Sequence, residues 1–300
     1  MADPALEHLV APVDPRLVWD LPALGAMPRH AELDPHVTRV LADNASLLTL
    51  DGTNTYVIGA PGSGEVLVVD PGPDDAAHLA AIDDAAAARD AQVVAVLVTH
   101  HHIDHAESAA AVASRLGARL LATTADVAGD VGTVIADGDV LRVGGVEVTA
   151  VATPGHCHDH VAYRLDHGPM LVGDHILGRG TSVVTHPDGD LTAYLESLRR
   201  VLDVGPDALY PGHGPQMAGD DPLAVVRYYL KHRAFREQQI LALLAEGPQD
   251  TSALVRRIYA DVDPQLWPAA AASTRSALDK MSREGRVIVE PGQPARLAVL

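Results

Sequence analysis

The sequence Thr99-His100-His101-His102-Ile103-Asp104-His105 directly follows an apolar run at residues 93–98. That run is short, continuous and rich in β-branched residues, which predicts a buried strand. In an extended chain, residues two apart point to the same side, so the side chains of His100 and His102 can bind one metal ion together. The stretch therefore predicts a metal site at the end of a strand.

Asp104 and His105 come where the chain turns into an Ala-rich segment at residues 107–116, for which we predict a helix. From this turn both side chains can face a second ion. The alternative is a His-rich surface loop that binds no metal. We favour the metal site because His100, His102, Asp104 and His105 fall within six residues at a strand end.

The bulk composition bounds the class of protein. Three hundred residues suffice for one large or two modest domains, and 47% of them are apolar while only 3% are aromatic. The single cysteine, Cys157, excludes a disulfide framework and a zinc site built on cysteines, and it indicates a reducing compartment. The sequence shows no secretory signal and no apolar run of about 18 residues, so we expect a cytoplasmic protein without membrane spans.

The net charge of −18 is unevenly distributed. Residues 1–221 hold 11 Lys and Arg against 32 Asp and Glu, a net of −21, whereas residues 222–300 hold 11 against 8, a net of +3. Because residues 1–221 are so acidic, they should repel polyanions unless basic residues are concentrated near the site. The simplest interpretation of the excess charge is a solvated acidic surface.

Residues 1–218 predict a catalytic domain with two sets of strands and with helices between and outside them. The first 45 residues carry weak signals and predict an irregular lead-in with one edge strand. Two hairpins are expected, at residues 56–59 with 65–70 and at residues 140–143 with 146–152. Further strands are predicted at residues 118–122, 161–165, 170–172 and 208–210, and helices at residues 74–90, 107–116 and 191–204.

Residues 219–300 predict a separate C-terminal domain. Helices are expected at residues 222–246, 251–260 and 270–284, followed by a hairpin of residues 286–290 and 295–300. This order is typical of a winged helix, which can bind nucleic acid. Because a net charge of +3 is small for that purpose, we favour a role in packing, in dimerisation or as a substrate lid.

Further polar residues stand just past the later predicted strands, and strand ends gathered along one edge of a layered fold can assemble a site. The candidate ligands are His100, His102, Asp104, His105, His156, Asp174 and His213. The simplest partition gives one ion His100, His102 and His156, and the other ion Asp104, His105 and His213.

Asp174 would bridge the two ions, since a carboxylate can present one oxygen to each. Histidine and carboxylate ligands suit zinc, and also iron or manganese. Two ions about 3.5–4 Å apart can share a water, lower its pKa and hold it as hydroxide. The predicted cofactor is therefore a pair of divalent ions.

This arrangement resembles the metallo-β-lactamase-fold hydrolases, whose His-x-His-x-Asp-His signature matches residues 100–105. The later ligands of that family fall on His156, Asp174 and His213, and its acidic residue after an early strand falls on Asp70. The resemblance implies an α+β protein with an αββα sandwich, a dinuclear site that is most often zinc, and hydrolysis of an ester, thioester, lactam or phosphodiester.

A narrower resemblance is to the beta-lactamase-like protein 2 group. It is carried by residues 51–56 (Asp-Gly-Thr-Asn-Thr-Tyr), 173–181 (Gly-Asp-His-Ile-Leu-Gly-Arg-Gly-Thr) and 232–240 (His-Arg-Ala-Phe-Arg-Glu-Gln-Gln-Ile). That group carries a C-terminal winged helix; some of its members are similar to single-strand endoribonucleases, while others are thioesterases or have no assigned function. The bridging aspartate is similar to the glyoxalase II and RNase Z side of the superfamily rather than to true β-lactamases.

The expected mechanism is attack by a metal-bridging hydroxide on a carbonyl or phosphorus. Asp104 would accept the proton of the nucleophile, and Asp70 would orient a ligand histidine. Loop residues that could contact the substrate are Asn54, Thr55, Thr181 and Ser182.

Several functions remain open at the level of sequence. A small-molecule thioesterase, esterase or lactonase fits the acidic charge best. A single-strand endoribonuclease acting on RNA fits the winged-helix resemblance but must overcome the charge of −21. A β-lactamase and a non-enzymatic nucleic-acid-binding regulator are weaker alternatives, and a homo-oligomer is compatible with all of them.

Overall fold

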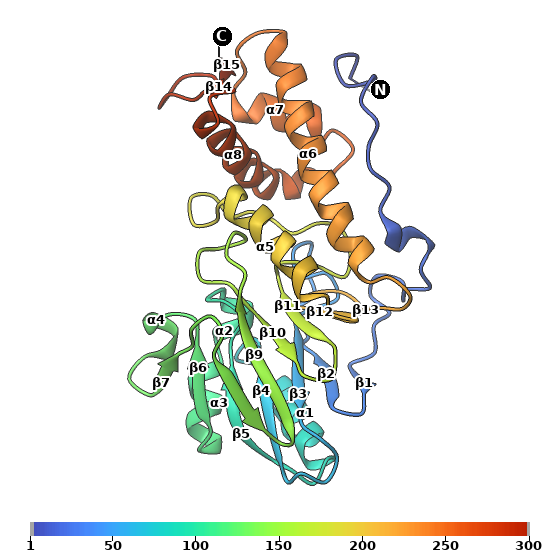
Figure 1. The fold of residues 1–300 in the computed structure, drawn as a ribbon, viewed down its shortest axis with the longest axis vertical. Helices are drawn as coiled ribbons and strands as arrows, with labels where there is room; N and C mark the ends of the chain where they lie inside the picture. Colours follow the sequence, from blue (N-terminus) through green and yellow to red (C-terminus); the bar gives the residue numbers. More distant parts are fainter. Residues whose placement is uncertain (1–2, 299–300) are drawn as a thin grey trace.

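Two β-sheets lie face to face in the computed structural model of the protein, which describes residues 3–298 (Figure 1). The first sheet has seven strands in the sequential order β1 to β7. Its middle strands β4, β5 and β6 are parallel, whereas β1 to β4 form an antiparallel meander. The strands are β1 (His30–Asp34), β2 (Val37–Leu41), β3 (Asn54–Ile58), β4 (Glu65–Val69), β5 (Gln92–Leu97), β6 (Arg119–Ala122) and β7 (Gly132–Val134).

The second sheet has six strands in the order β13-β12-β11-β10-β9-β8. Its neighbours pair antiparallel except for β11 and β12, which run parallel. The strands are β8 (Val140–Val143), β9 (Val146–Ala152), β10 (Val161–Leu165), β11 (Met170–Gly173), β12 (Ala208–Pro211) and β13 (Met217–Ala218). The predicted hairpins at residues 56–70 and 140–152 are confirmed by these pairings.

Alternation along the strands sorts apolar side chains into layers. In β4, Leu67 and Val69 face the second sheet, whereas Val66 and Val68 face helices on the outside. This is the period of two expected for a strand whose two faces are both buried. Tyr163 of β10, fully buried in the layer between the sheets, bonds the carbonyl of Val98 with its hydroxyl at 2.7 Å and so ties the sheets together.

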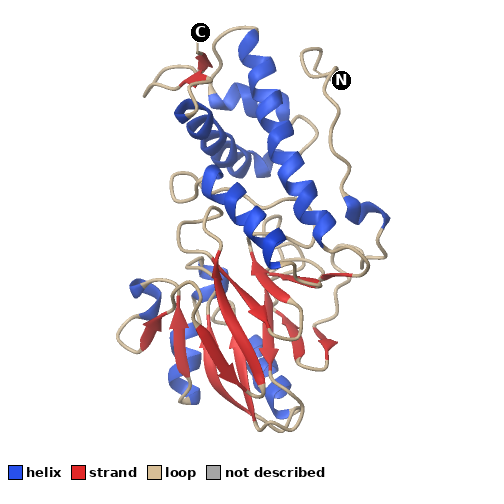
Figure 2. Ribbon diagram, viewed as in Figure 1, coloured by secondary structure: helices blue, strands red, loops and turns tan. Residues whose placement is uncertain are grey.

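Helices cover both outer faces (Figure 2). Helices α1 (Ala76–Ala87) and α3 (Ala109–Leu116) pack on the first sheet, and α5 (Leu191–Val204) packs on the second. The N-termini of α1 and α5 are capped by the carboxylates of Asp75 and Asp190, which accept from backbone N–H groups at 2.7 and 2.9 Å. The layers are therefore helix, sheet, sheet, helix, and the predicted αββα sandwich is confirmed.

The C-terminal helices stand above the sandwich in Figure 1. Helices α6 (Leu223–Ala245), α7 (Thr251–Ile258) and α8 (Trp267–Arg283) precede the two-stranded hairpin of β14 (Val287–Ile288) and β15 (Arg296–Leu297), which is the predicted winged-helix order. Residues 299–300 of the second hairpin strand predicted here lie outside the described residues.

The apolar core of the C-terminal helices is continuous with that of the sandwich. Tyr194 of α5, Tyr229 of α6 and Leu278 of α8 belong to one buried cluster. The helices therefore pack tightly on the catalytic part, and the division at residue 218/219 stays a prediction.

The structure differs from the sequence prediction at three places. Residues 1–45 contain two strands, β1 and β2, rather than one edge strand, together with the short 3-10 helix Pro15–Val18. The helix predicted at 107–116 begins at Ala109 as α3, and a single-turn helix that was not predicted, α2 (Ile103–Ala106), precedes it. Four further short elements of the described residues were not predicted: α4 (Ala125–Ala128), β7, β13 and the 3-10 helix Pro264–Leu266.

Among residues 3–298, no helix combines the length and the apolar character needed to cross a membrane.

Candidate metal centre

Loops that follow four strands meet at one edge of the sandwich. His100 follows β5, His156 follows β9, Asp174 follows β11 and His213 follows β12. His102 is the N-cap residue of the single-turn helix α2, which carries Asp104 and His105. The seven predicted ligands are thereby brought together, although they come from segments up to 113 residues apart.

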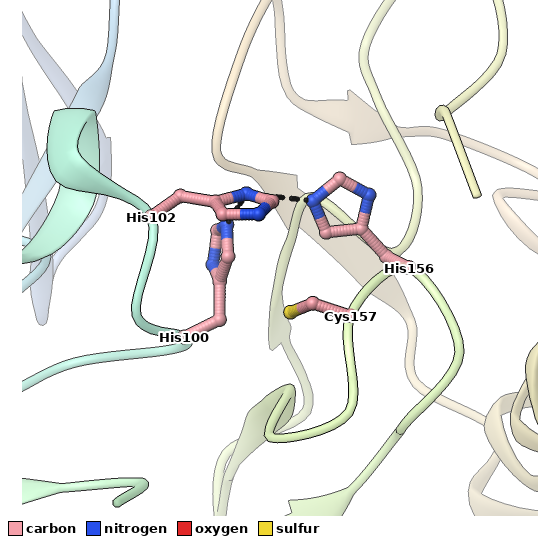
Figure 3. Close-up of side chains that lie close together, drawn as sticks. All are labelled: His100, His102, His156 and Cys157. Atoms are coloured by element: carbon pink, nitrogen blue, oxygen red, sulfur yellow. Dashed lines mark hydrogen bonds between the residues drawn. The ribbon is translucent and has the colours of Figure 1, made fainter. Parts of the chain in front are cut away.

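Three histidine rings form the first group. The Nδ1 atom of His102 lies 2.9 Å from Nε2 of His100 and 3.0 Å from Nε2 of His156. Figure 3 shows the three rings pointing toward one another, with the sulfur of Cys157 beside them. That thiol donates to Asp159 at 3.2 Å. The group matches the first half of the predicted partition.

The second group contains the predicted residues Asp104, His105 and His213. Nε2 of His213 lies 3.1 Å from a carboxylate oxygen of Asp104 and 3.3 Å from Nε2 of His105. His105 and His213 are buried, and Asp104 is about one-quarter exposed. The donor atoms thus converge, and the carboxylate of Asp104 stays partly exposed to solvent.

Asp174 lies between the two groups. Its Oδ1 atom is 3.4 Å from Nε2 of His105 and 3.4 Å from Nε2 of His213, and its Oδ2 atom is 3.9 Å from Nε2 of His156. Oδ1 is buried and has no hydrogen-bond partner within residues 3–298. A buried carboxylate oxygen without a hydrogen bond is costly, so this atom requires a proton or a cation.

Burial keeps the rings of the first group neutral. It lowers the pKa of His100 far below the usual range, and with help from His156 it lowers the pKa of His102 to about 4. The pKa of His156 is lowered as well, again chiefly by burial. Neutral imidazoles present lone pairs, so a ring nitrogen of His102 that lies about 3 Å from one nitrogen of His100 and one of His156 belongs to a group arranged to bind a cation.

Carboxylates reverse this effect in the second group. Burial opposes the charged form of His105 and of His213, but nearby carboxylates outweigh it. Asp70 and Asp174 raise the pKa of His105, and Asp174 and Asp104 raise the pKa of His213 to about 9. Burial of Asp174 by itself would raise the pKa of this carboxyl group. His213 and His105 outweigh that effect and hold the pKa of Asp174 well below its usual range. A divalent ion would take the place of the protons in this group.

Asp70 lies directly behind the second group. One of its oxygens is 2.8 Å from Nδ1 of His105, on the side of the ring away from His213. The same carboxylate accepts hydrogen bonds from the backbone N–H and the hydroxyl of Thr99, both at 2.7 Å. The predicted orienting role of Asp70 is consistent with this geometry. Thr99, which sequence reasoning missed, is the neighbour of His100 in the chain.

Two of the predicted substrate contacts do not fit the structure. Asn54 and Thr55 are fully buried in β3. The amide of Asn54 donates to the carbonyls of Pro211 and Gly214, on either side of His213, at 2.9 and 2.8 Å. The hydroxyl of Thr55 donates to the carbonyl of Asp70 at 2.6 Å. Both side chains position ligand loops and are out of reach of a substrate.

Ser182 and Thr181 lie on the other side of the centre. Ser182 is buried, and its hydroxyl donates to the carbonyl of Asp174 at 2.5 Å. Nδ1 of His156 is 2.6 Å from the carbonyl of Val183, which fixes the orientation of that ring. Thr181 is half-buried and lines a neighbouring cavity, so the predicted contact with substrate stays a prediction for this residue.

His160 is a positioning residue that contacts the backbone of a proposed ligand. The side chain is buried, its Nδ1 is 2.8 Å from the hydroxyl of Thr153, and its Nε2 accepts the backbone N–H of Asp174 at 3.1 Å. The ring thereby holds the backbone that presents Asp174. His175 and His78 are buried as well and do not belong to the ligand set.

The donor set fits divalent metal ions. Five imidazoles and two carboxylates suit zinc, iron or manganese. The orphaned oxygen of Asp174 and the close approach of neutral ring nitrogens are the features that a bound cation would satisfy.

Comparison with known proteins identifies the fold. The family model described as metallo-beta-lactamase superfamily matches residues 48–128 and 120–213, a span that includes every ligand named above. The chain belongs to the metallo-beta-lactamase superfamily. Members of this superfamily are metal-dependent hydrolases, and this chain is one of them.

The C-terminal part has a match of its own. The model of the beta-lactamase-associated winged helix domain matches residues 251–293. A beta-lactamase-like protein 2 homolog of Drosophila melanogaster is 33% identical over 89% of this chain and 94% of its own length. The lactamase-like protein aptB of Emericella nidulans is 32% identical over 90% of this chain and 88% of its own.

Solved structures agree on the fold. A beta-lactamase domain protein from Burkholderia ambifaria superposes with a TM-score of 0.78 at 21% identity, covering 95% of this chain and 97% of that one. A metallo-beta-lactamase family protein from Thermus thermophilus gives a TM-score of 0.75 at 24% identity, covering 89% and 100%.

Proposed function

We propose that this superfamily member binds two divalent ions, zinc in the first place, and hydrolyses a small-molecule thioester, ester or lactone. The observation that supports it best is the position of Asp174, whose two oxygens face two separate groups of imidazoles. The ligand sets are His100, His102 and His156 for one ion and Asp104, His105 and His213 for the other. Iron or manganese would fit the same donors.

When bound, a pair of divalent ions supplies an activated water and polarises the carbonyl under attack. The chain's own residues set the geometry for this reaction. Asp104 is the more exposed of the two ligand carboxylates, at 25% against 13% for Asp174, so we assign it the role of accepting the proton of the attacking water. Asp70 acts through His105 and is a positioning residue.

Charge favours a small substrate over a nucleic acid. The chain carries a net charge of −18, and its first 221 residues alone carry −21. A polyanion would have to approach against this field, whereas a small acyl compound would not. Single-strand RNA cleavage is therefore the second candidate, and the winged-helix match is its only support.

Metal analysis and a substrate panel test the proposal. The purified chain should carry two metal ions and hydrolyse one or more members of a panel of thioesters, esters, lactones, β-lactams and single-stranded RNA. RNA cleavage that weakens steeply with added salt would instead support the nuclease. A protein that takes up no divalent ion would overturn both candidates.

Replacing Asp174 with Ala tests the bridging role. We expect Asp174→Ala to lose at least one metal ion per chain and to lower kcat by about 10²-fold or more, because the shared ligand and its charge are removed. The matched control is Asp43→Ala, since Asp43 is exposed and pairs only with Arg29 among the described residues. An Asp174→Ala protein with two metals and normal turnover would refute the bridge.

A further inference from the structure

A cavity of about 300 Å³ lies between the catalytic loops and the C-terminal helices. Leucines at positions 47, 48 and 50 and residues 177–183 line one side, and helix α6 with the segment from Tyr259 to Ser273 lines the other. Three arginines, Arg179, Arg233 and Arg236, contribute to the lining. We call it the arginine cavity.

The arginine cavity adjoins the metal centre. Ser182 and Val183 line it, and the same two residues bond Asp174 and His156, as described above. On another side, the N–H of Gly178, between the lining residues Leu177 and Arg179, donates to the carbonyl of His213 at 2.9 Å. A molecule in this cavity would therefore lie beside loops that carry three of the ligands.

The three arginines have no carboxylate partners. Within residues 3–298, no Asp or Glu oxygen lies within 4.0 Å of Arg179, Arg233 or Arg236, although 40 acidic residues are present in the chain. The Nε atoms of all three and Nη2 of Arg179 are buried without a hydrogen-bond partner. Uncompensated buried charge is costly, so the cavity is built to receive a negative charge.

Only part of this cost is offset inside the protein. The guanidinium of Arg233 lies 4.9 Å from the ring centre of Tyr194 and donates to the carbonyl of Ser182. That of Arg236 lies 4.4 Å from the ring centre of Tyr259 and donates to Gln239 at 2.8 Å. No such contact involves Arg179 in the described part of the chain. Arg179 is thus the cation most available to a ligand.

We propose that the arginine cavity binds the far end of the substrate's acyl group, and that this end is an apolar segment carrying a carboxylate. The leucines would cover the apolar segment, and Arg179 and Arg236 would bind the carboxylate through the planar fork of guanidinium donors. This assignment rests on the proposed function for the reacting end, but the cavity itself can be tested without catalysis.

Binding of a sulfonate tests the cavity directly. We choose 2-phenylethanesulfonate because sulfonates are poor metal ligands, and its neutral partner is 2-phenylethyl methyl sulfone. Titration calorimetry on the metal-loaded protein should show the sulfonate binding at least about tenfold more tightly, as a charge-assisted contact predicts. Equal affinity of the two compounds would overturn the proposal.

Matched variants locate the binding. Arg179→Gln should abolish the preference for the sulfonate, and Arg236→Gln should weaken it. Arg142→Gln is the control, because Arg142 lies on β8, pairs with Glu147 and does not line the cavity. An Arg179→Gln protein that keeps the full preference for the sulfonate would contradict the assignment. If a variant does not fold, the affinities of the unmodified chain for the two compounds still decide whether the cavity prefers an anion.

Kinetics connect the cavity to the reaction. The adipoyl thioester of N-acetylcysteamine should have a kcat/KM at least about tenfold above that of the hexanoyl thioester, with the loss in Arg179→Gln appearing mainly in KM. If the sulfonate binds but neither thioester is hydrolysed, the proposed function is rejected and the assignment of the cavity as an anion site stands. If both thioesters are hydrolysed equally and the sulfonate does not bind, only the assignment of the cavity is rejected.

Discussion

Asp70 shows how one residue can hold a metal site from behind. Its backbone has a φ of +51°, and this turn at the end of β4 directs the carboxylate toward Thr99 and His105. Because both oxygens are occupied by these partners, the ring of His105 is held with Nε2 toward the second group of ligands. We therefore expect Asp70 to increase the affinity of the site for metal.

Replacing Asp70 with Asn should weaken metal binding. The amide keeps the size of the side chain, but it removes the charge that favours the N–H at Nδ1 of His105. We expect zinc affinity to fall by about 10–100-fold, measured by competition with a chelator. The control is Asp90→Asn, since Asp90 shares the φ of +51° but is exposed and remote from the site. Equal zinc affinity in both variants would refute the orienting role.

Gly212 leaves room for the centre. A Cβ atom at this position would lie 2.5 Å from Oδ1 of Asp174 and 2.6 Å from Cε1 of His105. Gly212→Ala should therefore displace both ligands and reduce bound metal by at least one ion per chain, while circular dichroism stays unchanged. Two bound ions in this variant would show that the ligands can move apart without loss of metal affinity.

At the scale of elements, the strands that carry ligands were predictable and the lead-in was not. Residues 93–98 and 208–210 are continuous apolar runs, and each ends just before a ligand, so local pattern suffices. Strand β2 is entirely buried yet contains Thr38 and Arg39. Arg39 donates to the carbonyl of Pro28 at 2.5 Å, and Thr38 accepts from Arg89 at 2.9 Å. Polar residues satisfied by such distant partners give no sequence signal for burial.

The substrate-contact residues could not be assigned from sequence for a related reason. Asn54 and Thr55 resemble loop residues in the sequence, but they continue β3 and bond the loops of His213 and Asp70. The hydrogen bonds of Asn54 join residues more than 150 positions apart, which no local pattern reveals.

Helix α6 is fixed to the rest of the winged helix by Glu237. This carboxylate is buried and accepts from Lys280 of α8 at 2.8 Å and from Arg286 at 2.5 Å. Glu237→Ala leaves two cations without their partner, so we expect the free energy of unfolding to fall by about 2 kcal/mol. Urea denaturation followed by circular dichroism measures it.

A matched surface pair gives the control for this helix. Glu246, at the C-terminal end of α6, pairs with Arg257 but is about half exposed. Glu246→Ala should cost less than about 1 kcal/mol, as is usual for exposed ion pairs. Similar losses in the two variants would mean that the buried contacts of Glu237 contribute no more than a surface pair.

At the scale of the whole molecule, the site depends on segments that the chain brings together only on folding. The arginine cavity takes its walls from the loop after β2, the loop after β11 and the C-terminal helices. The winged-helix order was predictable from its helices and hairpin, but its packing on the catalytic loops was not, because that contact depends on side chains from both parts.

Metal removal should lower the stability of the entire fold. Seven ligands from four loops join strands of both sheets, and bound ions stabilise the folded state by mass action. At a free metal concentration one hundred times Kd the gain for one ion is about 2.7 kcal/mol. We expect chelation to lower Tm by several degrees and zinc to restore it, as measured by calorimetry. An unchanged Tm would show that the loops hold their places without metal.

The single thiol of the chain offers a built-in reporter of how often the centre opens. Cys157 is inaccessible to solvent, and burial raises its pKa far above the usual range, so a maleimide cannot react with it while the loop is closed. Since its neighbour His156 is a proposed ligand, ions in the centre would clamp this loop shut. The rate of thiol labelling would then count opening events in each molecule, without a probe having to be introduced.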